Sequence, residues 1–167
     1  HLSLQAGDDI LLKRMKRRHS RAQSVALVER LKAARPEIAI GADLIAGFPT
    51  ETEAMFANTL ALIGDCQIVH AHIFPYSPRA GTPAARMPLV EPEVVKARAA
   101  RLREAANAKR SNWLTSLAGT TQQVLIERPG DRGHAGNFAE VRLPEARGVG
   151  EIMAVRIEAV RDGKLGA

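Results

Sequence analysis

The feature that most constrains this chain is an alternation of short apolar runs with segments of helical periodicity. Residues 38–47 form a nearly continuous apolar run, too short for a good helix, and residues 67–75 form another. Such runs are typical of strands that are buried on both faces of a parallel sheet. Apolar side chains recur at helical spacing in residues 9–17, in residues 20–34 and after Thr50. The alternation predicts an α/β fold with a parallel sheet.

Local signals mark where these elements begin. Residues 1–5 read as the end of a further strand. Ser20 with Gln23, and Thr50 with Glu53, have the spacing of capping boxes, in which two side chains satisfy free backbone N–H groups at a helix start. We therefore expect helices to begin after Ser20 and after Thr50.

The second half of the chain has a different pattern. Residues 76–88 contain three prolines and read as a long ordered loop, and residues 89–118 read as a connector helix with Val94, Val95, Ala99, Leu102 and Ala106 on its inward side. Residues 119–167 contain short β-rich runs, at 122–127, 138–143 and 152–160, separated by glycine and proline, which favours a small β-barrel or sandwich. We expect three parts, at residues 1–88, 89–118 and 119–167.

Composition excludes several classes of protein. No uncharged run approaches the roughly 20 residues that a membrane-spanning helix needs, and the first residues lack the pattern of a secretory signal. The one cysteine, Cys66, cannot form an internal disulfide or hold a metal cluster alone. We expect a cytoplasmic protein. Because the chain begins with His1 and a strand end, we also expect a fragment of a longer protein.

Positive charge is concentrated near the start of the chain, although the net charge is only +6. Residues 119–167 carry no net charge. A dense group of cations without an acid can neutralise phosphates, or can simply form a solvated helix face. This group consists of Lys13, Arg14, Lys16, Arg17, Arg18 and Arg21.

The candidate ligand site follows from the position of the predicted strands. In βα folds, ligands bind beyond the carboxyl ends of the strands. The segments there are Gln5–Gly7, residues 47–50 and residues 76–79. Their amide, backbone, phenol and guanidinium groups could line a cavity for a polar, adenosine-like ligand. The alternative is that Gly47, Phe48 and Pro49 only turn the chain.

Five further residues are interpreted separately. Asp43 lies within an apolar strand, so its carboxylate is either part of a site or paired for structural reasons. His70 and His72 share one strand face and could bind a metal, although no third ligand is evident nearby. Cys66 precedes a strand, which favours an inert thiol, and Trp113 is interpreted as a packing residue.

Several motifs, in one consistent order, resemble the radical S-adenosylmethionine methylthiotransferases. They are HLSLQAGDD from His1, LKRMKR from Leu12, DLIAGFPTET from Asp43 and YSPRAGTPAA from Tyr76. The resemblance implies that residues 1–88 are the C-terminal half of a radical-SAM (βα) barrel and residues 119–167 a small all-β TRAM-like module that binds RNA. The loops at residues 76–88 and 133–138 look most like the branch that adds a methylthio group to threonylcarbamoyladenosine in tRNA.

The resemblance also implies site residues and cofactors. It implies S-adenosylmethionine and two 4Fe–4S clusters in the full-length family, with the cluster-binding cysteines outside this chain. It assigns no catalytic residue and no metal ligand here. Arg79 would bind substrate phosphate or cofactor carboxylate. The S-adenosylmethionine side would be lined by Gln5, Gly47, Phe48, Pro49 and Tyr76, and the tRNA backbone would meet Lys13, Arg14, Lys16, Arg17 and Arg18.

The sequence departs from the family's usual residues at two positions, and three other interpretations of its function are open. Ala6 stands where the family usually has Ser, and Thr50 where it usually has Gly. The substrate could instead be isopentenyladenosine in tRNA or a ribosomal protein, as in sister branches. The chain could be a stand-alone RNA-binding protein. It could also be a structural remnant, whose unpaired strand edge would make it marginally stable or self-associating.

Overall fold

A computed structural model describes all of residues 1–167 and shows two compact units, His1–Lys109 and Arg110–Ala167. The first unit holds a parallel sheet with helices, and the second holds a separate mixed sheet, so the predicted α/β class is confirmed. The long helix α4, Pro92–Ser116, has residues in both units. None of the helices is long and apolar enough to span a membrane.

The sheet of the first unit contains the three predicted strands. They are β1 (Leu2–Gln5), β2 (Ile40–Ala46) and β3 (Ile68–Pro75), all parallel, in the order β1-β2-β3. β2 lies in the centre of the sheet, and five of its seven residues are buried, which accounts for its nearly unbroken apolar sequence. β1 pairs only with β2, so its other edge is free, as expected.

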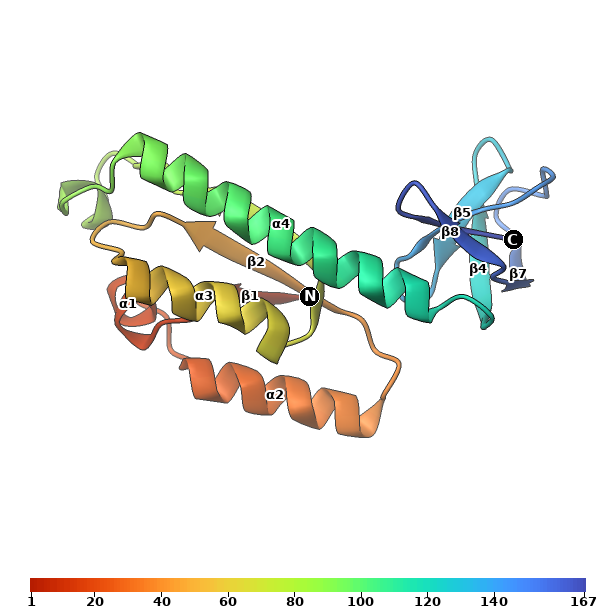
Figure 1. Cartoon of the computed structure of the whole chain (residues 1–167), viewed down its shortest axis with the longest axis horizontal. Helices are drawn as coiled ribbons and strands as arrows, with labels where there is room; N and C mark the ends of the chain where they lie inside the picture. Colours follow the sequence, from red (N-terminus) through yellow and green to blue (C-terminus); the bar gives the residue numbers. More distant parts are fainter. The chain divides into compact units, whose positions relative to one another are not determined.

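One face of this sheet is covered by helices (Figure 1). These are α2 (Arg21–Ala34), α3 (Glu53–Asp65) and α4. The core that they form with the sheet includes the fully buried side chains of Leu44, Phe56 and Leu102. Complete burial of one such side chain contributes about 1.5–3 kcal/mol.

The other face of the sheet carries a different set of side chains. Alternate residues of β2 face the helices, so Asp43 and Ile45 lie on the opposite face. His72 is paired in register with Asp43, and Phe74 with Ile45. Phe74 is 51% exposed. This open face leads to the carboxyl ends of the strands, where the candidate site lies.

The helix starts show one correct and one wrong prediction. Ser20 caps α2, and its hydroxyl and the Gln23 side chain form the predicted capping box. α3, by contrast, is capped by Thr52, whose hydroxyl accepts a hydrogen bond from the backbone N–H of Met55. Thr50 has a φ of +66° and cannot serve as the cap, because a capping residue has an extended backbone. The short helix α1, Asp9–Arg14, is capped by Asp8 and ends three residues earlier than predicted.

Helix α4 lies within residues 89–118, for which a helix is predicted. One side chain, that of Val94, does not face the core as expected. Ala99, Leu102 and Ala106 are buried, as predicted from their helical spacing. Val94 was expected to face inward and is 39% exposed. Val95 is half-buried and lies four residues before Ala99, on the same side of α4. Val94 lies about 100° around the helix from Val95 and therefore points away from that side.

The second unit contains a six-stranded sheet in the order β7-β4-β5-β6-β9-β8. All pairs are antiparallel except β6 with β9. The predicted runs fall on β4, β6 and the β7–β8 region, whereas β5 and β9 were not predicted. Leu114 and Trp113 of α4 pack in this unit's core. The strands are β4 (Thr121–Glu127), β5 (Arg132–Ala135), β6 (Glu140–Arg142), β7 (Ile152–Arg156), β8 (Ala159–Arg161) and β9 (Lys164–Gly166).

Candidate functional site

A cavity of about 630 Å³ lies at the carboxyl ends of the three parallel strands. It brings together seven of the eleven residues predicted for ligand or RNA binding: Gln5, Arg14, Lys16, Arg17, Phe48, Tyr76 and Arg79. The other four do not line it; they are Lys13, Arg18, Gly47 and Pro49. Side chains that the site prediction had left out, such as Ile45, Phe74 and Met15, complete the wall.

The turn after β1 is tightly held against α3. Gln5 is buried and has a φ of +69°, which is uncommon for a residue other than glycine. The backbone N–H of Gly7 donates to the Thr59 hydroxyl at 3.0 Å. A Cβ atom at Gly7 would lie 2.3 Å from the backbone oxygen of Asn58, so only glycine allows this approach. The turn thereby positions Gln5 at the cavity.

The loop after β2 is fixed from behind by a buried ion pair. Oε2 of Glu51 accepts a hydrogen bond from the backbone N–H of Gly47 at 2.9 Å and another from Nη1 of Arg98 at 2.9 Å. The same Nη1 donates to the backbone oxygen of Glu51 at 3.0 Å. Gly47 has a φ of +73°, and a Cβ atom there would lie 2.4 Å from Val95 of α4. Glu51 and Arg98 therefore hold Phe48 in place at the cavity wall.

Burial of the Glu51–Arg98 ion pair affects the pKa of Glu51. The Glu51 side chain is fully buried and that of Arg98 is 7% exposed. Burial raises the pKa of Glu51, and the Gly47 N–H and the Arg98 guanidinium oppose that rise. Arg98 and Arg101 both bind Glu53, and the hydrogen bond from Arg101 holds the pKa of Glu53 below its usual value. The sequence prediction missed this network; the signal was a glutamate after a turn and an arginine beside the buried stripe of α4.

Two aromatic rings form the apolar wall of the cavity. The rings of Phe48 and Tyr76 meet edge to face, with centroids 5.4 Å apart. The backbone N–H of Tyr76 donates to the Ala46 oxygen at 2.8 Å, which continues the sheet pairing past β3. The Tyr76 hydroxyl is buried and has no hydrogen-bond partner within the protein. A buried, unsatisfied hydroxyl beside an aromatic wall suits a ligand with both a flat apolar part and a polar group.

The opposite rim of the cavity is positively charged. Arg14, Lys16 and Arg17 come from the end of α1 and the residues after it, and Arg79 comes from the loop after β3. Nη1 of Arg14 donates to the Thr50 hydroxyl at 2.6 Å, which connects this rim to the loop after β2. Several exposed cations around one concave surface attract an anionic ligand.

The remaining candidate residues lie elsewhere. The Asp43 carboxylate contacts His1 and His72 on the open face of the sheet, so the residues grouped with His72 are His1 and Asp43 and not the predicted partner His70. Cys66 is buried at the end of α3, and burial raises the pKa of its thiol to about 11, as suits an inert cysteine. Trp113 packs against the core of the second unit, as predicted.

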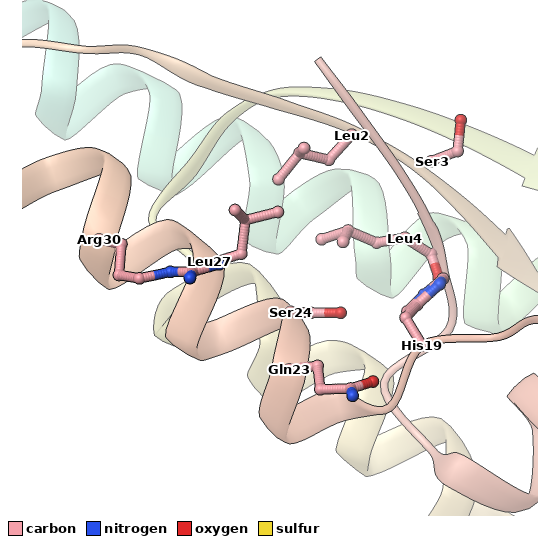
Figure 2. A pocket seen from close by; sticks show the side chains of 8 residues that line it. All are labelled: Leu2, Ser3, Leu4, His19, Gln23, Ser24, Leu27 and Arg30. Carbon is pink, nitrogen blue, oxygen red and sulfur yellow. The ribbon is translucent and has the colours of Figure 1, made fainter.

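A second, smaller cavity of about 440 Å³ lies between the free edge of β1 and helix α2. Figure 2 shows the side chains of Leu2, Leu4 and Leu27 around this space. Nε2 of His19 contacts the backbone oxygen of Leu4 at 3.2 Å. The groups here do not form a catalytic constellation; the cavity is an apolar surface along the open edge of the sheet.

Comparison with known proteins connects this architecture to one group of enzymes. The model of the radical SAM superfamily matches residues 1–63. The threonylcarbamoyladenosine tRNA methylthiotransferase MtaB of Rickettsia prowazekii is 43% identical over 98% of this chain. The tRNA-2-methylthio-N(6)-dimethylallyladenosine synthases of Erythrobacter litoralis and Maricaulis maris are 44% and 40% identical over 78% and 99% of it.

The match covers only part of these relatives. The chain spans 38% of the Rickettsia protein, 29% of the Erythrobacter protein and 38% of the Maricaulis protein. The similarity therefore extends over 78–99% of this chain but over only 29–38% of each relative.

Proposed function

Because this chain belongs to the radical S-adenosylmethionine methylthiotransferase family, we propose that it is part of a tRNA-modifying enzyme. The product would be tRNA with a methylthio group on C2 of N6-threonylcarbamoyladenosine, next to the anticodon. The observation that carries the proposal is the 43% identity to a threonylcarbamoyladenosine tRNA methylthiotransferase along 98% of the chain.

The cavity at the strand ends is the proposed site for S-adenosylmethionine. Its aromatic wall of Phe48 and Tyr76 suits the adenine ring, and the unsatisfied Tyr76 hydroxyl and Gln5 suit the polar groups of the ligand. Arg79 is placed to bind a carboxylate or a phosphate through paired N–H groups. These residues would bind and orient the cofactor and exclude water, while S-adenosylmethionine and the family's iron–sulfur clusters supply the radical and methyl-transfer chemistry.

The iron–sulfur clusters do not fit the residues of this chain. Such clusters are held by several thiolates, and the chain has a single cysteine, Cys66, which is buried behind the sheet at the end of α3. We therefore assign no cluster ligand here. In the proposed enzyme, the ligands come from the part of the relatives' length that this chain does not span.

The proposed contact with tRNA is made by the basic segment, defined as Lys13, Arg14, Lys16, Arg17 and Arg18. All five side chains are exposed, and three of them also line the cavity. Lysines and arginines that neutralise phosphates release bound counterions, so binding by this segment would weaken steeply as salt increases. Residues 119–167, proposed to be a TRAM-like module, carry equal numbers of acids and bases and would contribute less to that salt dependence.

The free edge of β1 supports the proposed barrel. A parallel strand with one unpaired edge and an apolar cavity beside it can receive a further strand and its helix. In the proposed full-length protein, a preceding segment pairs with β1 and places the open face of the sheet inside a (βα) barrel.

Complementation tests the proposed function. The full-length protein that includes this chain is expressed in bacteria lacking their own threonylcarbamoyladenosine methylthiotransferase, and the tRNA nucleosides are measured by mass spectrometry. We expect methylthio-threonylcarbamoyladenosine to return, and to be lost in a Tyr76→Ala variant that is expressed at the same level. If the wild-type protein restores no methylthio nucleoside, the assignment is wrong.

Measurements of tRNA modification and tRNA binding distinguish two other functions from the proposed one. Relatives named as dimethylallyladenosine synthases are 40–44% identical, so restoration of methylthio-dimethylallyladenosine (isopentenyladenosine) alone would assign the chain to that branch. A stand-alone RNA-binding role would show as tight, salt-sensitive tRNA binding by the 167-residue chain without any modification by the full-length protein.

A further inference from the structure

Three side chains from three neighbouring strands converge on the open face of the parallel sheet. They are His1, which precedes β1, Asp43 of β2 and His72 of β3. Nε2 of His1 lies 2.9 Å from Oδ1 of Asp43, and Nδ1 of His72 lies 3.3 Å from the same oxygen. The three potential ligand atoms all lie within 4.8 Å of one another.

The backbone brings these groups together. Asp43 and His72 are paired in register in adjacent parallel strands, so their side chains project side by side. The His1 ring lies beside His72, with ring centroids 4.9 Å apart. The His1 ring also lies beside Gly41. A Cβ atom on Gly41 would lie 2.6 Å from Nδ1 of His1. The absence of a side chain at Gly41 therefore leaves the space that the His1 ring occupies.

The donor set suits a transition metal. Zn²⁺ and Co²⁺ prefer imidazole nitrogen together with carboxylate oxygen, and donors of a tetrahedral Zn²⁺ lie about 3.3 Å apart at the usual bond lengths. The separations of 2.9 and 3.3 Å are close to that value. The Asp43 side chain is 25% exposed and that of His72 is 65% exposed, so a metal ion can enter and retain water or another ligand.

We propose that His1, Asp43 and His72 form a binding site for one divalent transition-metal ion. The site has two imidazoles and one carboxylate and leaves at least one coordination position open. It is independent of the proposed function, because it rests on three side chains of this chain and requires neither S-adenosylmethionine nor tRNA.

Metal binding is tested on the 167-residue chain by titration with Co²⁺, followed by its visible absorption, and with Zn²⁺ in competition with a chromophoric chelator. We expect one equivalent per chain. Asp43→Asn, which replaces the carboxylate by a neutral amide, and His72→Ala, which removes an imidazole ligand, should each weaken binding at least ~10-fold. Gly41→Ala should weaken it as well, because the added methyl group displaces the His1 ring and leaves the other two ligands intact.

His134→Asn is the matched control. His134 also contacts a carboxylate, that of Glu127 at 3.0 Å, but in the second unit, and its loss should leave the affinity unchanged. Circular dichroism verifies the fold of each variant, and NMR of the wild-type chain should show ring signals of His1 and His72 shifting on Zn²⁺ addition while His134 stays constant. The proposal is overturned if no saturable uptake occurs, if Asp43→Asn and His72→Ala bind as the wild type does, or if the shifted signals belong to other histidines.

Discussion

Two neighbouring residues in the loop after β2 have opposite effects on its stability. Thr50 holds a left-handed backbone with a φ of +66°, a strained conformation for a β-branched residue. Glu51 accepts hydrogen bonds from Gly47 and Arg98 and fixes the same loop. The loop is therefore strained at one residue and held in place by the next, at the point where it reaches the cavity.

Replacing Thr50 tests the strain. Thr50→Gly and Thr50→Ala both remove the hydroxyl that binds Arg14, but only glycine adopts a positive φ without cost. We expect Thr50→Gly to be more stable than Thr50→Ala by about 1 kcal/mol, within the range given for such strain. Urea unfolding followed by far-ultraviolet circular dichroism measures the difference. Equal stability of the two variants would show that Thr50 is not strained.

Replacing Glu51 tests the buried ion pair. Glu51→Gln leaves the Arg98 guanidinium buried without its counter-charge, and we expect a loss of about 3 kcal/mol in the free energy of unfolding. Glu53→Gln removes the other, 60% exposed, carboxylate that binds Arg98 and should cost much less. Chemical denaturation of both variants gives the comparison. If Glu53→Gln costs as much as Glu51→Gln, the loop is not held by the buried pair.

Sequence reasoning reached some of these residues and not others. It placed Gln5, Phe48 and Tyr76 at strand ends, and the structure brings all three to one cavity. It assigned Thr50 as a helix cap, because residue spacing does not reveal a positive φ; the family's usual glycine at this position was the available signal. Glu51 and Arg98 each stand out in their own segments, but they lie 47 positions apart, so no local pattern shows that they pair.

At the scale of helices and strands, whether a strand could be predicted depended on its length, its residues and its burial. The central strand β2 was recognised because five of its seven residues are buried and only Asp43 interrupts its apolar sequence. β5 and β9 were missed, since each is short and contains a glycine, a residue that reads as a turn signal. β9 is placed instead by pairing with β6 and by an ion pair between Lys164 and Glu140.

This ion pair makes the second unit sensitive to acid. The hydrogen bond from Lys164 lowers the pKa of Glu140 in the folded chain below its value of about 4.3 in the unfolded chain. The resulting stability is complete above that unfolded value and is lost as the pH falls through the folded value. We expect Glu140→Gln to cost about 0.5–1 kcal/mol at pH 7 and progressively less as the pH falls below about 4.3.

Urea unfolding followed by the fluorescence of Trp113, which packs in this unit, measures the effect at pH 7 and at pH 3. Glu145→Gln is the control, because Glu145 is 76% exposed and only loosely paired with Arg147 at 3.6 Å. A constant difference between Glu140→Gln and the wild type from pH 7 to pH 3 would contradict this role of Glu140.

At the scale of the whole molecule, the two units have separate cores. The core of the first unit includes Leu44, Phe56 and Leu102, and that of the second includes Leu114 and Val124; the two sets have no residue in common. Stability in each unit depends on burial within its own core. The units are therefore expected to respond separately to a core substitution, although α4 contributes residues to both.

The only tryptophan makes this separation measurable. Trp113 reports on the second unit, whereas far-ultraviolet circular dichroism reports mainly on the first, which holds α1, α2, α3 and the larger part of α4. Leu114→Ala should lower the stability seen by fluorescence by about 2–5 kcal/mol and leave the helical transition in place. Leu44→Ala should do the reverse. If either substitution moves both transitions by the same amount, the chain unfolds as one cooperative unit, because only a shared transition transmits the loss from one core to the other.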